Sequence, residues 1–205
     1  CRKEALMKEY TIVRRPEKLD WSSIPSLQMD CLYETEPLPI SAQAQLCYDD
    51  EALYVRLSAV EEHIRAENFG TLDEICEDSC LEFFFSPMEG DRRYFNIECN
   101  LNEKLYLGMG SNVQTLVRFV PEFPAIHPKA QRTADGWETV YSVPYSFIRQ
   151  FFPAFSPAPG KTMKANFYKC GDKTVQPHYL CWCPVVKLPA ASFHNPDTFG
   201  TLRFA

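Results

Sequence analysis

The sequence predicts an all-β fold: a single antiparallel β-sandwich of the jelly-roll or immunoglobulin-like kind, with one or two short helical turns. Most stretches between turn residues alternate apolar and polar side chains, which is typical of half-buried strands, and helical periodicity is scarce. Sixteen prolines and eight glycines divide the chain at short intervals. Many short strands separated by frequent turns are typical of a β-sandwich.

The alternation predicts a series of strands, most of them paired in hairpins. Turn residues at 49–50 separate the first pair, and the segment 134–136 separates a later pair. The best helical candidate is 145–151, directly after Pro144. The expected strands cover residues 42–48, 52–60, 79–86, 93–101, 104–109, 128–132, 137–143, 162–169 and 199–204.

Length and composition indicate one globular domain over residues 1–205. Hydrophobic residues make up 45% of the chain and charged residues 23%, as in ordinary globular proteins. The net charge of -6 argues against a nucleic-acid partner and against attraction to anionic membrane surfaces. No apolar run approaches the roughly 20 residues that cross a bilayer, so we expect no membrane-spanning segment.

The nine cysteines favour reduced thiols. Their number is odd, and several lie in strand-like segments, where a reduced cysteine packs as a small apolar residue. Residues 1–10 lack the apolar centre of a signal peptide. A reducing compartment such as the cytoplasm is therefore favoured. If the N-terminus was processed, the protein would instead be extracellular or lipid-anchored through Cys1.

The hairpin expected at 79–101 gathers polar side chains on one face. A turn centred on 88–90 would place Glu82 opposite Asn96, and the other face of the hairpin is wholly apolar. Carboxylates and amides can bind the neighbouring hydroxyls of a sugar, and aromatic rings can cover its C–H face. The alternative is an outer face in contact with solvent. The gathered residues are Glu82, Tyr94, Asn96, Glu98 and Asn100.

The sequence offers little support for catalysis, metal binding or a cofactor. Glu82 and Glu98 would fit a glycoside hydrolase only at the required carboxyl separation, so we expect no catalytic residues and no enzyme. The histidines lack metal-ligand spacing, and the cysteines at 76–80 and 181–183 are not zinc-knuckle pairs, so no metal site is expected. We expect no cofactor, although the acidic turn 49–51 could chelate a structural calcium ion.

The order of motifs resembles family 9 carbohydrate-binding modules. The stretches YDDEALYV at 48–55 and DSCLEFFF at 78–85 are similar to two strand motifs of that family. DGW at 135–137, VP at 143–144 and WCP at 182–184 follow in order. FHNPDTFGTL at 193–202 is similar to the closing motif of the family. The resemblance extends from about residue 40 to the end of the chain.

The resemblance implies a non-catalytic sandwich that binds a sugar or an oligosaccharide chain end, associated with glycoside hydrolases in polysaccharide degradation. A family glutamate falls on Glu82, and the closing clamp tryptophan falls on Phe193. The family arginine falls on Asn96, the helper asparagine falls on Ala190, and the first clamp tryptophan would lie near 75–76, where there is no aromatic residue. The expected ligand-binding residues are Glu82, Tyr94, Asn96, Glu98, Phe193 and His194.

Two alternatives remain open. The missing clamp tryptophan and arginine favour a domain whose sugar site is degraded and which serves as a scaffold or interaction module. Similar sandwiches can also hold haem through methionine and histidine. The residues available for that role are Met109 with His178 or His194.

Overall fold

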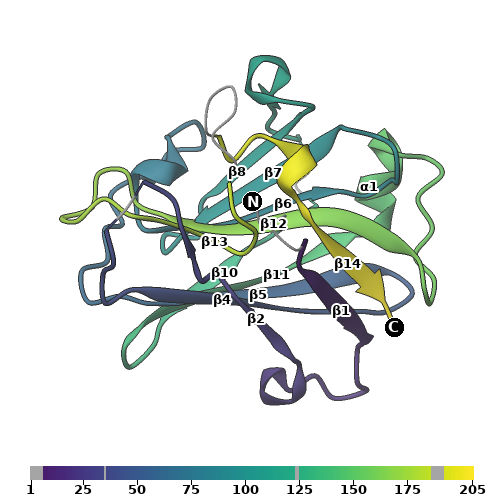
Figure 1. Ribbon diagram of the computed structural model, residues 1–205, viewed down its shortest axis with the longest axis horizontal. Coiled ribbons are helices and arrows are strands. Elements are labelled where there is room, and N and C mark those ends of the chain that lie inside the picture. Colours follow the sequence, from purple (N-terminus) through teal and green to yellow (C-terminus); the bar gives the residue numbers. More distant parts are fainter. Residues whose placement is uncertain (1–6, 35, 123–124, 186–191) are drawn as a thin grey trace, which may run out of the picture.

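A computed structural model describes residues 7–34, 36–122, 125–185 and 192–205. The all-β prediction is confirmed (Figure 1). The strands are β1 (Glu9–Arg14), β2 (Ser26–Gln28), β3 (Cys31–Leu32), β4 (Ser41–Tyr48), β5 (Ala52–Val60), β6 (Cys80–Ser86), β7 (Tyr94–Asn100), β8 (Leu105–Gly110), β9 (Val117–Arg118), β10 (Lys129–Arg132), β11 (Gly136–Pro144), β12 (Thr162–Cys170), β13 (Tyr179–Cys181) and β14 (Gly200–Phe204).

Helical structure is limited to one short α-helix and four single 3-10 turns within the described residues. The helix α1 (Tyr145–Phe151) begins directly after Pro144, as predicted. The 3-10 turns are η1 (Trp21–Ser23), η2 (Ile75–Glu77), η3 (Val113–Thr115) and η4 (Pro196–Thr198). No helix in the described part of the chain is long and apolar enough to cross a bilayer.

The strands form one curled, mixed sheet. Its order is β10-β11-β5-β4-β1-β14-β12-β6-β7-β8-β9. Strand β1 runs parallel to β14, with Tyr10 beside Leu202, and also parallel to β4, with Val13 beside Cys47. The prediction of a wholly antiparallel sandwich is therefore wrong at β1. Parallel neighbours need long connections, and both partners of β1 lie far from it in the sequence.

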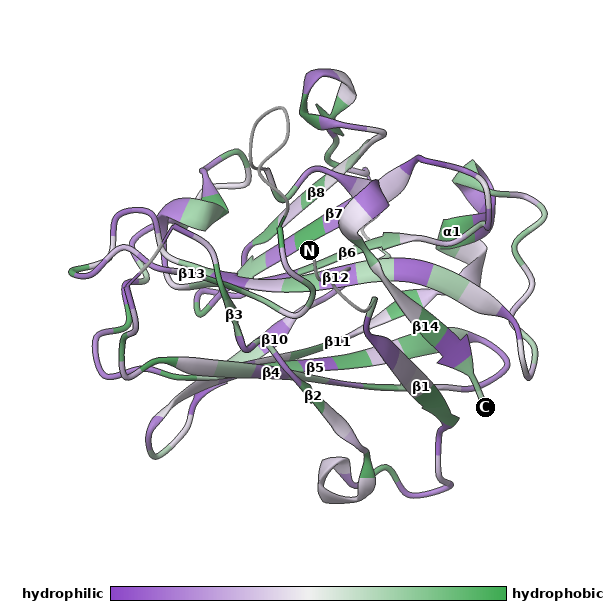
Figure 2. Ribbon diagram, viewed as in Figure 1, coloured by the Kyte–Doolittle hydropathy of each residue, from purple (hydrophilic) through white to green (hydrophobic). Residues whose placement is uncertain are grey.

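Figure 1 shows the curl of the sheet. The side chains of the main core pack inside it. They come from β4, β5 and β11 on one side and from β6, β7 and β12 on the other. Along β5 buried and partly exposed residues alternate, and Figure 2 shows the matching alternation of hydropathy along the strands. The period-2 pattern therefore identified the inward face of these strands correctly.

A buried polar cluster connects the two halves of the sheet. Glu61, which follows β5, accepts hydrogen bonds from Trp137 Nε1 (2.5 Å) and Ser79 Oγ (2.9 Å). Lys169 Nζ of β12 lies 3.1 Å from Glu61 Oε1 and 2.7 Å from His178 Nε2. We call these five residues the Glu61 cluster. Its ion pair is buried, and its polar atoms are hydrogen-bonded to one another, as buried charges require.

Candidate functional site

The polar face predicted on the 79–101 hairpin is present, but its register differs by two residues. Glu82 lies opposite Glu98, and Phe84 lies opposite Asn96, whereas Asn96 was expected opposite Glu82. The reason is the turn, because the connection between the strands runs from 87 to 93 and is not centred on 88–90. A shift of two residues keeps every side chain on its face, so the predicted grouping survives.

This polar face is covered by other parts of the chain. Glu82, Asn96 and Glu98 are 2%, 0% and 7% exposed, so the alternative of a solvent-exposed outer face is wrong. Phe193 and the turn η2 contribute side chains that pack over the face. Glu98 is thus the most exposed of the three polar side chains.

The hydrogen bonds of the polar face are incomplete. Asn96 Nδ2 donates to Glu98 Oε1 (3.0 Å), and Cys170 Sγ donates to Glu82 Oε1 (2.7 Å). Asn96 Oδ1 and Glu98 Oε2 are buried and have no hydrogen-bond partner among the described residues. A buried acceptor without a donor is costly, so these two oxygens mark a place where a ligand with donor groups would be stabilised.

Burial and neighbouring negative charges raise the pKa of the two carboxyl groups on this face, Glu82 and Glu98. Burial raises the pKa of Glu98 to about 7, opposed by the hydrogen bond from Asn96. Burial and the neighbouring Glu98 hold the pKa of Glu82 well above its usual range. Two carboxylates placed opposite each other on neighbouring strands cannot both ionise easily without a cation or a set of donors.

Asn100 belongs to the support of this site. Asn100 Nδ2 donates to Asp78 Oδ2 and to the Asn68 carbonyl, both at 2.9 Å. Asp78 is buried and also accepts from the backbone amides of Glu67 and Asn68. Together they fix the loop that leads into η2. In the sequence Asp78 stands out only as the first residue of the motif at 78–85, and its structural role follows from its contacts.

An aromatic group surrounds the face at its partly exposed edge. The ring of Phe193 stacks on Tyr168 at a centroid distance of 4.0 Å and meets the edge of Tyr179. Tyr106, opposite Glu98 on β8, packs on the same cluster. The predicted aromatic surface therefore contains more rings than Phe193 alone. The tyrosines were missed because they come from strands far apart in the sequence.

Arg118 supplies a cation beside Glu98. Its guanidinium lies 4.4 Å from the centre of the Tyr106 ring and donates to the carbonyls of Thr71, Leu72 and Asp73. It lowers the pKa of Glu98, although burial outweighs it. No sequence pattern indicates a role for Arg118, because β9 holds only two residues.

Tyr94 and His194 lie together at the other end of the face. Tyr94 is buried, and its hydroxyl lies 2.8 Å from His194 Nδ1. The rings of Tyr94 and His194 both pack on Phe84. Burial lowers the pKa of His194 to about 4, so its imidazole is neutral at pH 7. Any direct role of the two in ligand binding stays a prediction.

The position expected for the first clamp tryptophan lies at the edge of the site. Ile75 is buried and Cys76 is partly exposed, and both pack near Cys80 and Cys170. Phe69, the nearest aromatic residue upstream, is 62% exposed. Ala190 and Cys1 lie outside the described residues.

The haem alternative finds no support in the geometry. Met109 packs on the main core inside the sheet, whereas His194 packs on the outward face, so the two cannot bind the same iron. His178 is buried and its Nε2 lies 2.7 Å from Lys169 Nζ.

The acidic turn at 49–51, the candidate for calcium binding, uses one of its carboxylates within the protein. Asp49 accepts hydrogen bonds from the amides of Glu51 and Ala52 and from the Tyr54 hydroxyl.

Two comparisons with known proteins find carbohydrate-binding proteins. The sequence profile of carbohydrate-binding family 9 matches residues 13–204. A candidate carbohydrate-binding protein from Bacteroides uniformis is 28% identical, with a TM-score of 0.81 over 97% of this chain and 100% of that one. A comparison with curated proteins finds no significant match.

Two further structures share the fold at low identity. Both are of a family 9 carbohydrate-binding module from Caldicellulosiruptor kristjanssonii. The complex with glucose is 14% identical, with a TM-score of 0.68 over 97% of this chain and 96% of that one. The complex with cellotriose is 13% identical, with a TM-score of 0.65 over 96% of this chain and 93% of that one.

Proposed function

The chain belongs to carbohydrate-binding family 9, and from this premise we propose that it binds a carbohydrate without catalysing a reaction on it. The observation that carries the proposal is the family match over residues 13–204. The two Caldicellulosiruptor kristjanssonii structures, which hold glucose and cellotriose, support it. We also propose that the domain, expected over 1–205, works beside glycoside hydrolases that degrade polysaccharides.

We place the sugar at the outward face of β6 and β7, at the edge where Glu98, the least buried of the three polar side chains, lies. Glu98 Oε2 accepts from a sugar hydroxyl, and Asn96 holds the carboxyl by its hydrogen bond to Oε1. Phe193 borders the ligand, with Tyr106 beside it, and His194 lies at the other end of the same face. Glu82 and Tyr94 stay beneath as the inner part of the polar face. Support comes from the unpartnered buried oxygens, because a sugar hydroxyl donates the bond they lack.

The ligand we propose is a single sugar or the end of an oligosaccharide chain. The polar groups are confined to one short stretch of two strands, between η2 and the segment 192–195. Glucose and cellotriose share a terminal glucose unit, so binding of a chain end is consistent with both complexes of the relatives.

Isothermal titration against glucose, cellotriose and a panel of other oligosaccharides tests this function. We expect saturable binding to at least one of them at millimolar concentration or below. The Glu98→Gln variant should bind about ten- to a hundredfold more weakly, because a hydrogen bond to a charged group contributes about 1.5–3 kcal/mol. Glu17→Gln, which removes the same charge from an exposed position, should bind as the natural chain does.

The scaffold alternative, in which the sugar site is degraded, predicts no sugar binding. The low exposure of Glu82 and Asn96 favours it, together with the absence of an aromatic residue at 75–76. If the folded protein binds none of the sugars at millimolar concentration, the carbohydrate proposal is overturned and the degraded site is favoured. Equal affinity in Glu98→Gln would remove Glu98 from the site while leaving sugar binding in place.

A further inference from the structure

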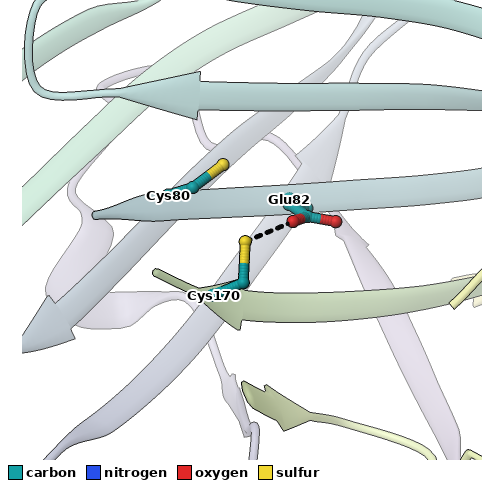
Figure 3. Close-up of side chains that lie close together, drawn as sticks. All are labelled: Cys80, Glu82 and Cys170. Carbon is teal, nitrogen blue, oxygen red and sulfur yellow. Dashed lines mark hydrogen bonds between the residues drawn. The ribbon is translucent and has the colours of Figure 1, made fainter. Parts of the chain in front are cut away.

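Two cysteines and one glutamate meet on the polar face, at its junction with β12. Cys80 and Cys170 lie directly opposite each other on β6 and β12, and Glu82 follows two residues after Cys80 on the same face. Their two sulfur atoms and a carboxylate oxygen all lie within 4.8 Å of one another, and all three residues are buried. Figure 3 shows the Cys170 sulfur pointing at the Glu82 carboxyl.

We propose that Cys80, Glu82 and Cys170 form a binding site for a thiophilic divalent cation of the zinc type. Two thiolates and a carboxylate are a ligand set that zinc accepts, and calcium and magnesium prefer oxygen ligands alone. In a tetrahedral site with Zn–S bonds near 2.3 Å, ligand atoms are separated by about 3.5–3.8 Å. The observed spacing needs only small side-chain movements to reach that geometry.

The charges around the three residues favour a cation. Glu98 and Asp172 add negative potential at Glu82, and Lys169 only partly offsets it. Glu98 Oε2 is buried without a hydrogen-bond partner among the described residues, so a cation close by would stabilise it as well. Glu98 lies opposite Glu82 on the neighbouring strand β7, so this observation concerns the same part of the sheet and does not depend on the cysteine pair.

Binding exchanges protons for the metal ion. The two thiol protons, and the Glu82 carboxyl proton where it is present, pass to solvent as the Zn–S and Zn–O bonds form. No oxidant or reductant takes part. Three protein ligands leave one coordination position for water or another donor. Cys76, which is partly exposed and packs against Cys80 and Cys170, marks the side from which an ion reaches the site.

Cobalt titration tests the site directly. The protein is reduced, freed of metal with a chelator and titrated with Co²⁺ without oxygen and without sugar. We expect a thiolate-to-cobalt charge-transfer band that saturates at one ion per chain and disappears when Zn²⁺ is added. The absence of such a band in the natural chain overturns the proposal. Since no sugar is present, that result leaves the carbohydrate proposal standing.

Substitutions of the three proposed ligands test whether they bind the ion. Cys80→Ser, Cys170→Ser and the isosteric Glu82→Gln should each lower cobalt affinity at least tenfold, as loss of a ligand demands. Cys181→Ser is the matched control, because Cys181 is buried and also faces a cysteine across a strand pair, but it donates to the Cys31 carbonyl. An unchanged affinity in Glu82→Gln, or an equal loss in Cys181→Ser, overturns this ligand set even if a cysteine variant fails to fold.

Discussion

His194 lies against Phe84 and Tyr94, and its Nδ1 atom lies 2.8 Å from the Tyr94 hydroxyl. A neutral imidazole can accept that hydrogen bond, whereas the protonated ring cannot. Burial lowers the pKa of His194 from 6.5 to about 4. Between these two pH values the unfolded chain binds a proton that the folded chain does not.

We therefore predict that His194 makes the protein less stable as the pH falls from 6.5 to 4. A shift of this size corresponds to at most about 3 kcal/mol, with the full stability present above pH 6.5. Urea unfolding at pH 7 and at pH 4.5 measures the loss. His194→Gln, which cannot take up a proton, should lose less stability over this range than the natural chain does. His63→Gln, at an exposed position, should behave as the natural chain. A similar loss in both variants would contradict the prediction.

Single residues also show what the sequence can and cannot predict about the site. The alternation along β6 and β7 placed Glu82, Asn96 and Glu98 on one face, because side-chain direction follows from strand geometry alone. Their burial was not predictable, since the cover comes from Phe193 and η2, which are distant in sequence from each other. The meeting of Cys80 with Cys170 depends on the pairing of β6 with β12, which no local pattern indicates.

At the scale of elements, hairpins were predictable and the placement of β1 was not. All nine expected strands are present, because their turns and alternation are local features. Strands β1, β2, β3, β9 and β13 were missed. Four of these, β2, β3, β9 and β13, have only two or three residues each, too few to show a pattern. Strand β1 is longer, but it pairs with strands from distant parts of the chain.

The Tyr10 hydroxyl links β1 by hydrogen bonds to β4 and to the segment before β2. It donates to the Pro25 carbonyl (2.6 Å) and accepts from the Leu46 amide (3.1 Å). We predict that Tyr10→Phe destabilises the fold by about 1–3 kcal/mol, because both backbone groups lose a buried partner. Tyr141→Phe is the control: its buried hydroxyl has no hydrogen-bond partner among the described residues, so its removal should cost little. Equal losses in urea unfolding would contradict this role of Tyr10.

At the scale of the whole molecule, the Glu61 cluster connects the halves of the sheet. We predict that Lys169→Met destabilises the protein by about 3–5 kcal/mol, because it leaves the buried Glu61 carboxylate without its cation. Adding Glu61→Gln should restore part of this loss. A double-mutant cycle in urea measures the coupling, and additive single losses would show that the ion pair does not couple the two halves.

The central position of β1 and β14 has a consequence for synthesis on the ribosome. The strands before β14 supply both outer parts of the sheet, yet β14 lies between β1 and β12 and completes the connection of one part to the other (Figure 1). Until residues 200–204 leave the exit tunnel, residues 9–12 of β1 and 162–165 of β12 lack the strand that pairs with them. The nascent chain is therefore open to wrong pairing with other chains until β14 emerges, and the sheet can close only then.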